Sequence, residues 1–417
     1  MMKILFLSTL NFATNPRFYK EIRLARQSGI EVEIICFEFN NWSYSINKDL
    51  INSLSDCRIH LIQGNRKPFL QWAMSVFKER LYRLLGRANL LSDKWLSQAV
   101  SRRSDLLIKY INRLSGGYDL VIGHNPGALY PVYFAAKKFN CKSGFDVEDY
   151  HPGEGKDKLV QQLTMKLMTE YLPKMDYVTF AAPLMWKKHA EDIGSEGTNW
   201  KVILNAFPKE QFEYNPVTEG PLRLLWFSQN VNYNRGLEQW IPALEPFSNE
   251  IELTLIGNKK EPFYSEYVKG RPFVNYISPM DLKELNRKVC GFDIGLALEP
   301  GKDQNNIISI PNKLITYYQA GLYILASNTP GQREFLQSHP HTGMILSPEQ
   351  DGFLDKISQV IESKDSIRRT KKERFLRAKE LSWEGESEKL LRLWSEVAET
   401  DTEVSRQGGD TLGRVAP

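Results

Sequence analysis

The sequence opens on a strand, a helix and a second strand, and this order constrains the fold more than any other feature. Residues 3–10 and 31–37 are apolar runs that predict buried strands, and residues 16–27 between them have the periodicity of a helix that ends before Gly29. Two strands joined through a helix are expected to pair in parallel. The predicted fold class is therefore α/β.

The same pattern restarts in the second half of the chain. Single hydrophobic cores stop growing near ~250–300 residues, so a chain of 417 residues is expected to form two domains. We predict a first Rossmann-like domain over residues 1–205 and a second over residues 206–385, divided by a stretch that contains several Pro and Gly residues. In the second domain, strands are predicted at residues 222–227, 251–256, 293–298 and 323–326.

The C-terminal segment is predicted to be a helix followed by a disordered tail. Residues 386–400 place Leu390, Leu393 and Trp394 on one apolar face at helical spacing. We expect this helix to cross back onto the first domain. Residues 401–417 are polar and contain Gly, a composition typical of disorder.

The composition excludes several classes of function. No apolar run approaches the ~20 residues of a membrane-spanning helix. The four cysteines form no CxxC pair, which indicates a reducing compartment and no zinc site. The fingerprints of dinucleotide-binding proteins, P-loop nucleotidases and HExxH zinc proteases are absent. The basic residues lack the interleaved aromatics of nucleic-acid binders, so no nucleic-acid partner is expected.

Positive charge is concentrated in one segment of the first domain. The net charge of the chain is only +4, yet residues 58–113 hold 12 Lys/Arg against three Asp/Glu. Residues 69–87 also carry apolar side chains at three- and four-residue steps, with basic residues on the flanks. We predict that residues 66–87 can bind an anionic membrane surface. The alternative is a core-facing helix with a solvated basic edge.

Polar side chains follow two of the predicted strands in the first domain. His124 comes after a buried run at residues 118–123, and Glu148 and Asp149 come after residues 142–147. Ligands of open parallel sheets bind beyond the carboxyl ends of the strands, so these side chains are candidate catalytic residues. A carboxylate there could act as a general base, and the alternative is helix capping with solvated loop charge.

Two cationic residues stand at predicted helix starts in the second domain. Asn312 and Lys313 follow Pro311, where the free N–H groups of a helix N-terminus favour a phosphate. Arg235 precedes Gly236 before another helix, and a guanidinium offers paired donors to phosphate oxygens. The alternative for either cation is an exposed residue at a helix start.

Six short motifs occur in order along residues 1–398. They are Asn15-Pro16-Arg17, His124-Asn125-Pro126, Val202-Ile203-Leu204-Asn205, Arg235-Gly236, Pro311-Asn312-Lys313 and Ser382-Trp383-Glu384. Together they resemble the motifs of GT-B glycosyltransferases, and in particular the retaining family 4 (glycosyltransferase group 1). The resemblance implies the GT-B architecture, in which two Rossmann-like β/α/β domains face a central cleft.

The resemblance also implies roles for individual residues. In the second domain, Arg235, Asn312, Lys313 and Thr316 would bind the nucleotide-sugar donor. Thr316 occupies the position of the second Glu in the family's Glu-x7-Glu motif, which is degraded in this chain. In the first domain, Asn15 and Arg17 would lie on the acceptor side, and His124 would contact the transferred sugar.

The predicted function is transfer of a sugar from a UDP- or GDP-linked donor to a lipid-linked or polysaccharide acceptor. We expect retention of configuration, a place in cell-surface polysaccharide biosynthesis, no metal or other cofactor, and a cytoplasmic location with peripheral contact at the inner face of the plasma membrane. Two alternatives remain. A non-hydrolysing sugar-nucleotide epimerase would need more carboxylates in the cleft. A catalytically weak sugar-binding or scaffold subunit is favoured by the Thr at position 316.

Overall fold

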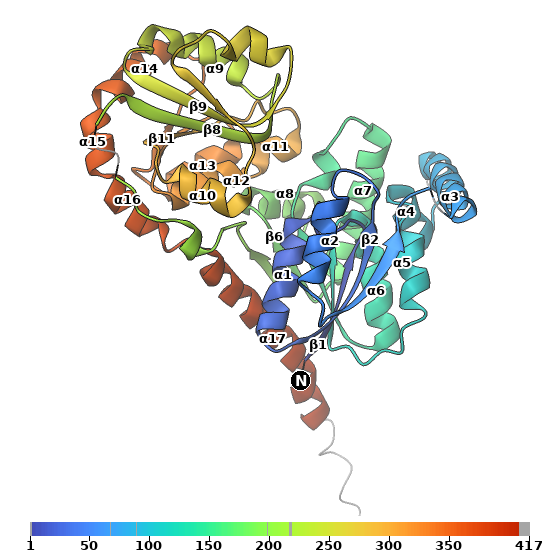
Figure 1. Cartoon of the computed structure of the whole chain (residues 1–417). Coiled ribbons are helices and arrows are strands. Elements are labelled where there is room, and N and C mark those ends of the chain that lie inside the picture. Colours follow the sequence, from blue (N-terminus) through green and yellow to red (C-terminus); the bar gives the residue numbers. More distant parts are fainter. Residues whose placement is uncertain (1, 67, 89, 198, 217–218, 408–417) are drawn as a thin grey trace, which may run out of the picture. The chain divides into compact units, whose positions relative to one another are not determined.

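The chain divides into two compact units in a computed structural model that describes residues 2–66, 68–88, 90–197, 199–216 and 219–407 (Figure 1). Unit 1 comprises Met1–Ile203 together with Ser387–Pro417, and unit 2 comprises Leu204–Glu386. The chain therefore leaves unit 1 after residue 203 and returns to it through its last helix.

Unit 1 is built on a seven-stranded sheet in which every neighbouring pair is parallel. The strand order is β3-β2-β1-β4-β5-β6-β7, with β1 at the centre. Residues 4–7 of β1 are fully buried, as expected for an apolar strand covered on both faces. The strands are β1 (Lys3–Ser8), β2 (Glu31–Glu38), β3 (Arg58–Gln63), β4 (Leu120–His124), β5 (Lys142–Val147), β6 (Tyr177–Phe180) and β7 (Trp200–Val202).

Helices connect these strands. The side chain of Asn15 caps α1 by accepting a hydrogen bond from the backbone N–H of Phe18 at 3.0 Å, and Pro16 occupies the first turn. This cap fixes the start of α1 next to the end of β1. The helices of this part of the chain are α1 (Pro16–Gln27), α2 (Tyr44–Asn52), α3 (Phe69–Arg87), α4 (Asp93–Val100), α5 (Ser104–Ile111), α6 (Pro126–Phe139), α7 (Lys158–Tyr171) and α8 (Pro183–Ile193).

Unit 2 repeats this plan with a six-stranded parallel sheet in the order β10-β9-β8-β11-β12-β13. Trp226 and Trp240 are buried in its core. The strands are β8 (Leu222–Val231), β9 (Ile251–Lys259), β10 (Val274–Ile277), β11 (Ile294–Ala297), β12 (Tyr323–Ala326) and β13 (Gly343–Ile345). The helices are α9 (Leu237–Leu244), α10 (Leu282–Val289), α11 (Gln304–Ile308), α12 (Asn312–Gln319), α13 (Pro330–Ser338), α14 (Phe353–Glu362), α15 (Lys364–Arg369) and α16 (Lys371–Ala378).

The last helix, α17 (Trp383–Gln407), packs into unit 1. Trp394 is fully buried there, donates from Nε1 to the Tyr177 hydroxyl at 2.8 Å, and meets the ring of Phe6 edge-on at 6.2 Å. The helix extends to Gln407 and so includes residues 401–407 of the predicted tail. Propagation of a nucleated helix costs little, even through polar residues. The rest of the predicted tail, residues 408–417, lies outside the described residues.

Candidate functional site

At the carboxyl edge of the first sheet, a buried ion pair joins helix α1 to strand β5. Arg17 donates from Nε and from one terminal nitrogen to the two carboxylate oxygens of Asp146, at 2.8 and 2.6 Å, and its other terminal nitrogen donates to the carbonyl of Ile203 at 2.9 Å. Burial alone would raise the pKa of Asp146, but the charge and hydrogen bonds of Arg17 hold it below its usual range. Arg17 therefore positions Asp146 in this structure.

His124 ends strand β4 beside this ion pair and is completely buried. Its Nε2 lies 3.2 Å from a carboxylate oxygen of Glu21, and its Nδ1 lies 3.5 Å from Asp146. Burial lowers the pKa of His124, but the charge and hydrogen bond of Glu21 and the charge of Asp146 outweigh this effect, so the pKa is raised. His124 thus lies between two buried carboxylates, and burial raises the pKa of Glu21 as well.

Glu21, His124 and Asp146 also place three possible metal-ligand atoms within 4.8 Å of one another. However, both carboxylate oxygens of Asp146 already accept hydrogen bonds from Arg17, and one also accepts from the Thr179 hydroxyl at 2.6 Å. A cation would have to displace a bidentate guanidinium from a buried position. The donor set therefore fits a charge network better than a metal site.

Glu148 follows strand β5 and is partly buried near this network. Its Oε1 accepts from the side-chain amides of Asn15, at 3.1 Å, and Asn125. Asn125 in turn accepts from the Ser8 hydroxyl at 2.9 Å, and its backbone has a φ of 69°. Burial raises the pKa of Glu148 to about 7. A carboxyl group that titrates near neutral pH can accept or donate a proton during turnover.

Two cationic residues, Lys313 and Arg235, lie at the carboxyl edge of the unit 2 sheet. Lys313, in the first turn of α12, is 9 % exposed and lies beside the end of β11. Its Nζ donates to the carbonyl of Leu298 at 2.9 Å, pairs with Glu299 at 3.2 Å and stands 5.3 Å from the centre of the Trp226 ring. Burial lowers the pKa of Lys313, although the Glu299 charge raises it.

Arg235 lies in the loop between β8 and α9 and is partly buried. Its charge lowers the pKa of Lys313, so the two cations share one electrostatic environment. Within the described part of the chain, Arg235 makes no hydrogen bond or ion pair. The next residue, Gly236, has a φ of 83°, and a Cβ there would lie 3.2 Å from Leu298. This close approach fixes the loop against Leu298, whose carbonyl accepts the hydrogen bond from Lys313.

Two other predicted donor residues have different environments. Asn312 is exposed, and its side-chain oxygen accepts from Asn205 at 2.8 Å. Thr316 is only 1 % exposed, one turn beyond Lys313. The sequence context predicts Pro311 in the first turn of this helix, but Pro311 is the N-cap of α12 and lies one residue before the helix begins. In unit 1, Asp149 is partly buried, and its carbonyl accepts from the backbone N–H of His151 at 2.9 Å.

Helix α13 adds a polar residue to the same edge of unit 2. Gln332 lies in the first turn after β12 and is completely buried. Among the described residues, neither its side-chain nitrogen nor its oxygen has a hydrogen-bond partner. An unpaired buried amide is costly, so a ligand that pairs with it would gain affinity.

The structure thus brings the predicted residues together in two groups. Asn15, Arg17, His124 and Glu148 are linked in unit 1, and Arg235 and Lys313 are neighbours in unit 2. Sequence reasoning missed Glu21 and Glu299, the carboxylate partners of His124 and Lys313. A Glu on the apolar face of α1 was the available signal for Glu21, because a charge at a buried position needs a partner.

Comparison with solved structures identifies the fold. Sucrose-phosphate synthase from Thermosynechococcus elongatus superposes with a TM-score of 0.65 at 13 % sequence identity, and the match covers 95 % of this chain and 99 % of the synthase. A glycosyltransferase from Rickettsia africae gives 0.63 at 15 % identity, covering 96 % of this chain and 99 % of that one. The chain has the GT-B fold.

A third GT-B structure was solved with a nucleotide. Anabaena HepE in complex with UDP gives a TM-score of 0.62 at 14 % identity, and the match covers 96 % of this chain and all of HepE. No protein-family model and no curated protein sequence matches the chain. Within the described residues, none of the helices has the length and apolar character needed to cross a membrane.

Proposed function

We propose that this GT-B chain is a glycosyltransferase that transfers a sugar from a UDP- or GDP-linked donor. The observation that carries the proposal is a pair of cations at the carboxyl edge of the unit 2 sheet: Lys313 in the first turn of α12, which donates to the Leu298 carbonyl, and Arg235 in the loop that Gly236 fixes against Leu298. Parallel sheets bind ligands at this edge, and two cations there suit a nucleotide diphosphate. HepE, which shares the fold, was solved with UDP-glucose.

In the proposed reaction, the bond between the anomeric carbon and the diphosphate breaks, and the acceptor hydroxyl forms a new glycosidic bond. Negative charge grows on the leaving phosphate as this bond breaks. Arg235 and Lys313 would stabilise that charge directly, so we propose that no metal ion is needed for this step. We further propose retention of configuration, which rests on the motif resemblance alone.

Unit 1 would supply the acceptor side. The motif resemblance assigns His124 to the transferred sugar, but its side chain is completely buried between Glu21 and Asp146, so we propose that it acts through the charge of this network and not by direct contact. Glu148, whose pKa is raised to about 7, would order the acceptor hydroxyl or take its proton, with Asp149 next to it. Asn15 would act through Glu148, and Arg17 through Asp146.

A sugar-binding or scaffold subunit is the second candidate. One observation favours it: Thr316, at the position of the family's Glu, is almost completely buried and carries no charge. A subunit of this kind would bind a nucleotide sugar without releasing the nucleotide.

Nucleotide release distinguishes the two candidates. The full chain is incubated with UDP-glucose, other UDP-sugars and GDP-sugars, with and without a bacterial membrane extract, and free UDP or GDP is measured. Release that depends on the extract supports transfer to an acceptor. Binding of UDP by calorimetry without release from any donor would support the scaffold, and neither binding nor release would reject both.

We also propose that unit 1 binds an anionic membrane and that the acceptor is lipid-linked. Helix α3 stands beside α4 at the periphery of unit 1 (Figure 1). Its apolar stripe points to solvent: the exposed fractions of Leu70, Phe77 and Leu84 are 77, 62 and 60 %. Ser75, a polar residue, is the one buried residue of α3, so the alternative of a core-facing stripe does not describe this helix.

The charge of α3 fits the same proposal. Arg80 and Arg87 are exposed, and the helix turns its other face to α4, where Tyr82 stacks on Trp95 at 5.4 Å. Of the proposed surface at residues 66–87, residue 67 lies outside the described chain. An apolar stripe with basic flanks gains apolar burial plus about 1 kcal/mol per basic residue at an anionic surface. The protein would then act at the inner face of the plasma membrane, in polysaccharide assembly.

Liposome binding tests this part of the proposal. The chain should cosediment with phosphatidylglycerol vesicles and much less with phosphatidylcholine vesicles. Salt at 0.5 M should weaken the binding, because screening shortens the range of exposed charges to roughly 3–10 Å. Equal recovery in the supernatant with both lipids at low salt would reject the membrane surface and leave a soluble acceptor.

A further inference from the structure

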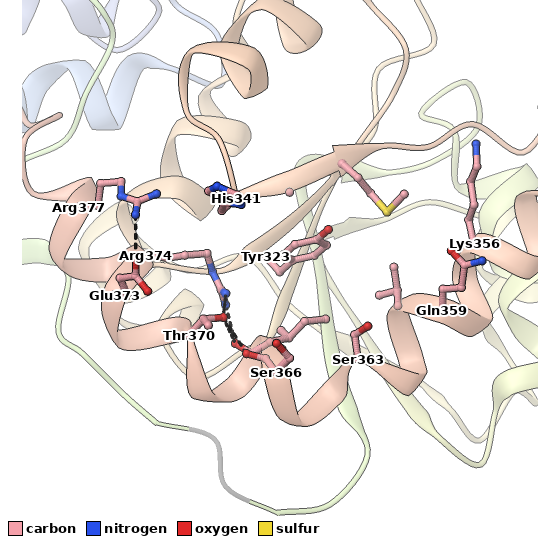
Figure 2. A pocket seen from close by; sticks show the side chains of 14 residues that line it. Tyr323, His341, Lys356, Gln359, Ser363, Ser366, Thr370, Glu373, Arg374 and Arg377 are labelled. Carbon is pink, nitrogen blue, oxygen red and sulfur yellow. Dashed lines mark hydrogen bonds and ion pairs between the residues drawn. The ribbon is translucent and has the colours of Figure 1, made fainter.

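A cavity of about 650 Å³ lies in unit 2, at the edge of the sheet opposite to Lys313. It is bounded by Tyr323 and Gly343, the first residues of the parallel strands β12 and β13, and by helices α14, α15 and α16 (Figure 2). Lys313, in contrast, lies beside the last residues of β11. The length of the strands therefore separates this cavity from the proposed donor site.

Basic residues dominate the surroundings of the cavity. Lys356, Arg374 and Arg377 line it, against a single carboxylate, Glu373. Figure 2 shows Arg377 and Lys356 at opposite ends, with the ring of Tyr323 between them. The surrounding segment 364–379 holds eight Lys/Arg and two Asp/Glu, a net charge of +6. This field favours an anion.

The buried cations of this segment are poorly neutralised. Arg374 is 4 % exposed and donates to two backbone carbonyls and to the hydroxyl of Thr370. Lys371, which is 1 % exposed, donates to three carbonyls. Burial lowers the pKa of Arg374 to about 10 and that of Lys371 to about 8. A nearby anion would offset the cost of burying these charges.

Several polar groups on the cavity wall are unused. Within the part of the chain that the structure describes, the side chains of Lys356, Gln359, Ser363 and Ser366 make no hydrogen bond or ion pair. They come from one continuous stretch of α14 and α15 and line the same wall (Figure 2). Hydroxyl and amide groups of this kind match the hydroxyls of a sugar, and a volume of this size holds a small metabolite.

We propose that this cavity binds a phosphorylated sugar as a second ligand of the protein. Lys356 would bind the phosphate, and Arg377, at the opposite end of the cavity beside its partner Glu373, would bind the far end of the sugar. Ser363, Ser366 and Gln359 would bind the sugar hydroxyls. The proposal goes beyond the proposed transferase activity, because the residues involved do not take part in it.

The probe is glucose 6-phosphate, titrated calorimetrically into the full chain with and without saturating UDP. We expect one binding event per chain that UDP does not abolish. Lys356→Ala and Arg377→Ala should each weaken it about tenfold or more, the scale for a lost hydrogen bond to a charged group. The matched control is Arg369→Ala, which removes an exposed cation of α15 that does not line the cavity, and it should change the affinity little.

Further titrations distinguish the possible ligands from one another, and they distinguish this cavity from the proposed donor site. Inorganic phosphate with the same affinity as glucose 6-phosphate would overturn the sugar assignment, and so would equal binding of glucose. Equal weakening by Lys356→Ala and Arg369→Ala would indicate unspecific electrostatics and overturn the site. UDP binding must survive in Lys356→Ala. If neither UDP nor GDP binds but glucose 6-phosphate does, the proposed function fails while this inference stands.

Discussion

Arg235 is the residue on which the proposed activity depends most directly. Arg235→Ala should lower kcat/KM about 30- to 10³-fold, because the leaving diphosphate loses a charge-assisted contact worth on the order of 2–4 kcal/mol in the transition state. The midpoint of thermal unfolding should change little, since the guanidinium has no hydrogen bond or ion pair within the described residues.

The assay measures nucleotide release with the donor found active. Arg287→Ala is the matched control, because Arg287 is an exposed arginine of α10 that lies apart from the site residues. Unchanged turnover in Arg235→Ala would remove this residue from the site.

Glu148 offers a prediction about pH and stability. Its pKa is raised to about 7 from the usual 4.5, so between these values the folded protein binds more protons than the unfolded chain. The free energy of unfolding therefore falls as pH rises from 4.5 to 7. Glu148→Gln removes this cost and keeps an oxygen that can accept from Asn15 and Asn125.

We expect Glu148→Gln to be more stable than the parent at pH 8, by on the order of 1–3 kcal/mol, and to gain nothing at pH 4.5. Urea unfolding at both pH values measures this difference. Turnover should fall, as expected where a site costs stability. The exposed Glu250, changed to Gln as a control, should alter neither. If the gain in unfolding free energy of Glu148→Gln over the parent is no larger at pH 8 than at pH 4.5, Glu148 does not carry a costly buried charge.

At the scale of elements, α3 is the helix whose exposed apolar stripe requires a partner. Phe77→Ser combined with Leu84→Ser should reduce binding to phosphatidylglycerol vesicles at least about tenfold, because each buried side chain of this size contributes roughly 1.5–3 kcal/mol. Thermal stability should not fall, since these side chains are 62 and 60 % exposed.

The matched control for α3 lies in unit 2. Leu282 and Leu376 are 50 and 52 % exposed, so Leu282→Ser with Leu376→Ser removes a somewhat smaller area of exposed apolar surface elsewhere. If both double variants retain the same bound fraction as the parent, the surface of α3 is not the membrane contact.

Sequence periodicity found elements with strong local signals. Helices α1 and α3 and strands β5 and β12 have the predicted bounds. The periodicity of residues 93–114 predicts a single helix, but the structure divides this segment into α4 and α5, because Ser101 adopts an extended conformation. Strands β10 and β13, of four and three residues, were missed since so few residues show no periodicity.

The candidate site shows a similar limit. Residues at strand ends and helix starts, such as His124 and Lys313, could be predicted because parallel sheets place function there. Their partners Glu21 and Glu299 could not be predicted in the same way. The pairing of Glu21 with His124 spans 103 positions and depends on how α1 packs over the sheet. No local pattern contains that information.

At the scale of the whole molecule, the path of the chain makes a distinctive prediction. Unit 1 is completed by residues that follow unit 2 in the sequence, and Trp394 of α17 anchors them through Tyr177 and Phe6. Trp394→Ala should destabilise unit 1 by roughly 3–5 kcal/mol, the cost of emptying a buried aromatic position. The loss of stability should therefore appear in strands that lie far upstream of Trp394 in the sequence.

Hydrogen exchange with mass spectrometry can locate this effect. In Trp394→Ala, peptides that cover β1 and β6 should exchange faster, because these strands contain Phe6 and Tyr177. Peptides that cover β8 and β11 should keep their protection. Trp240→Ala is the matched control, since Trp240 is buried in the core of unit 2, and it should show the reverse pattern. If Trp394→Ala leaves β1 and β6 protected, α17 does not hold unit 1 together, and its return to that unit has no energetic consequence.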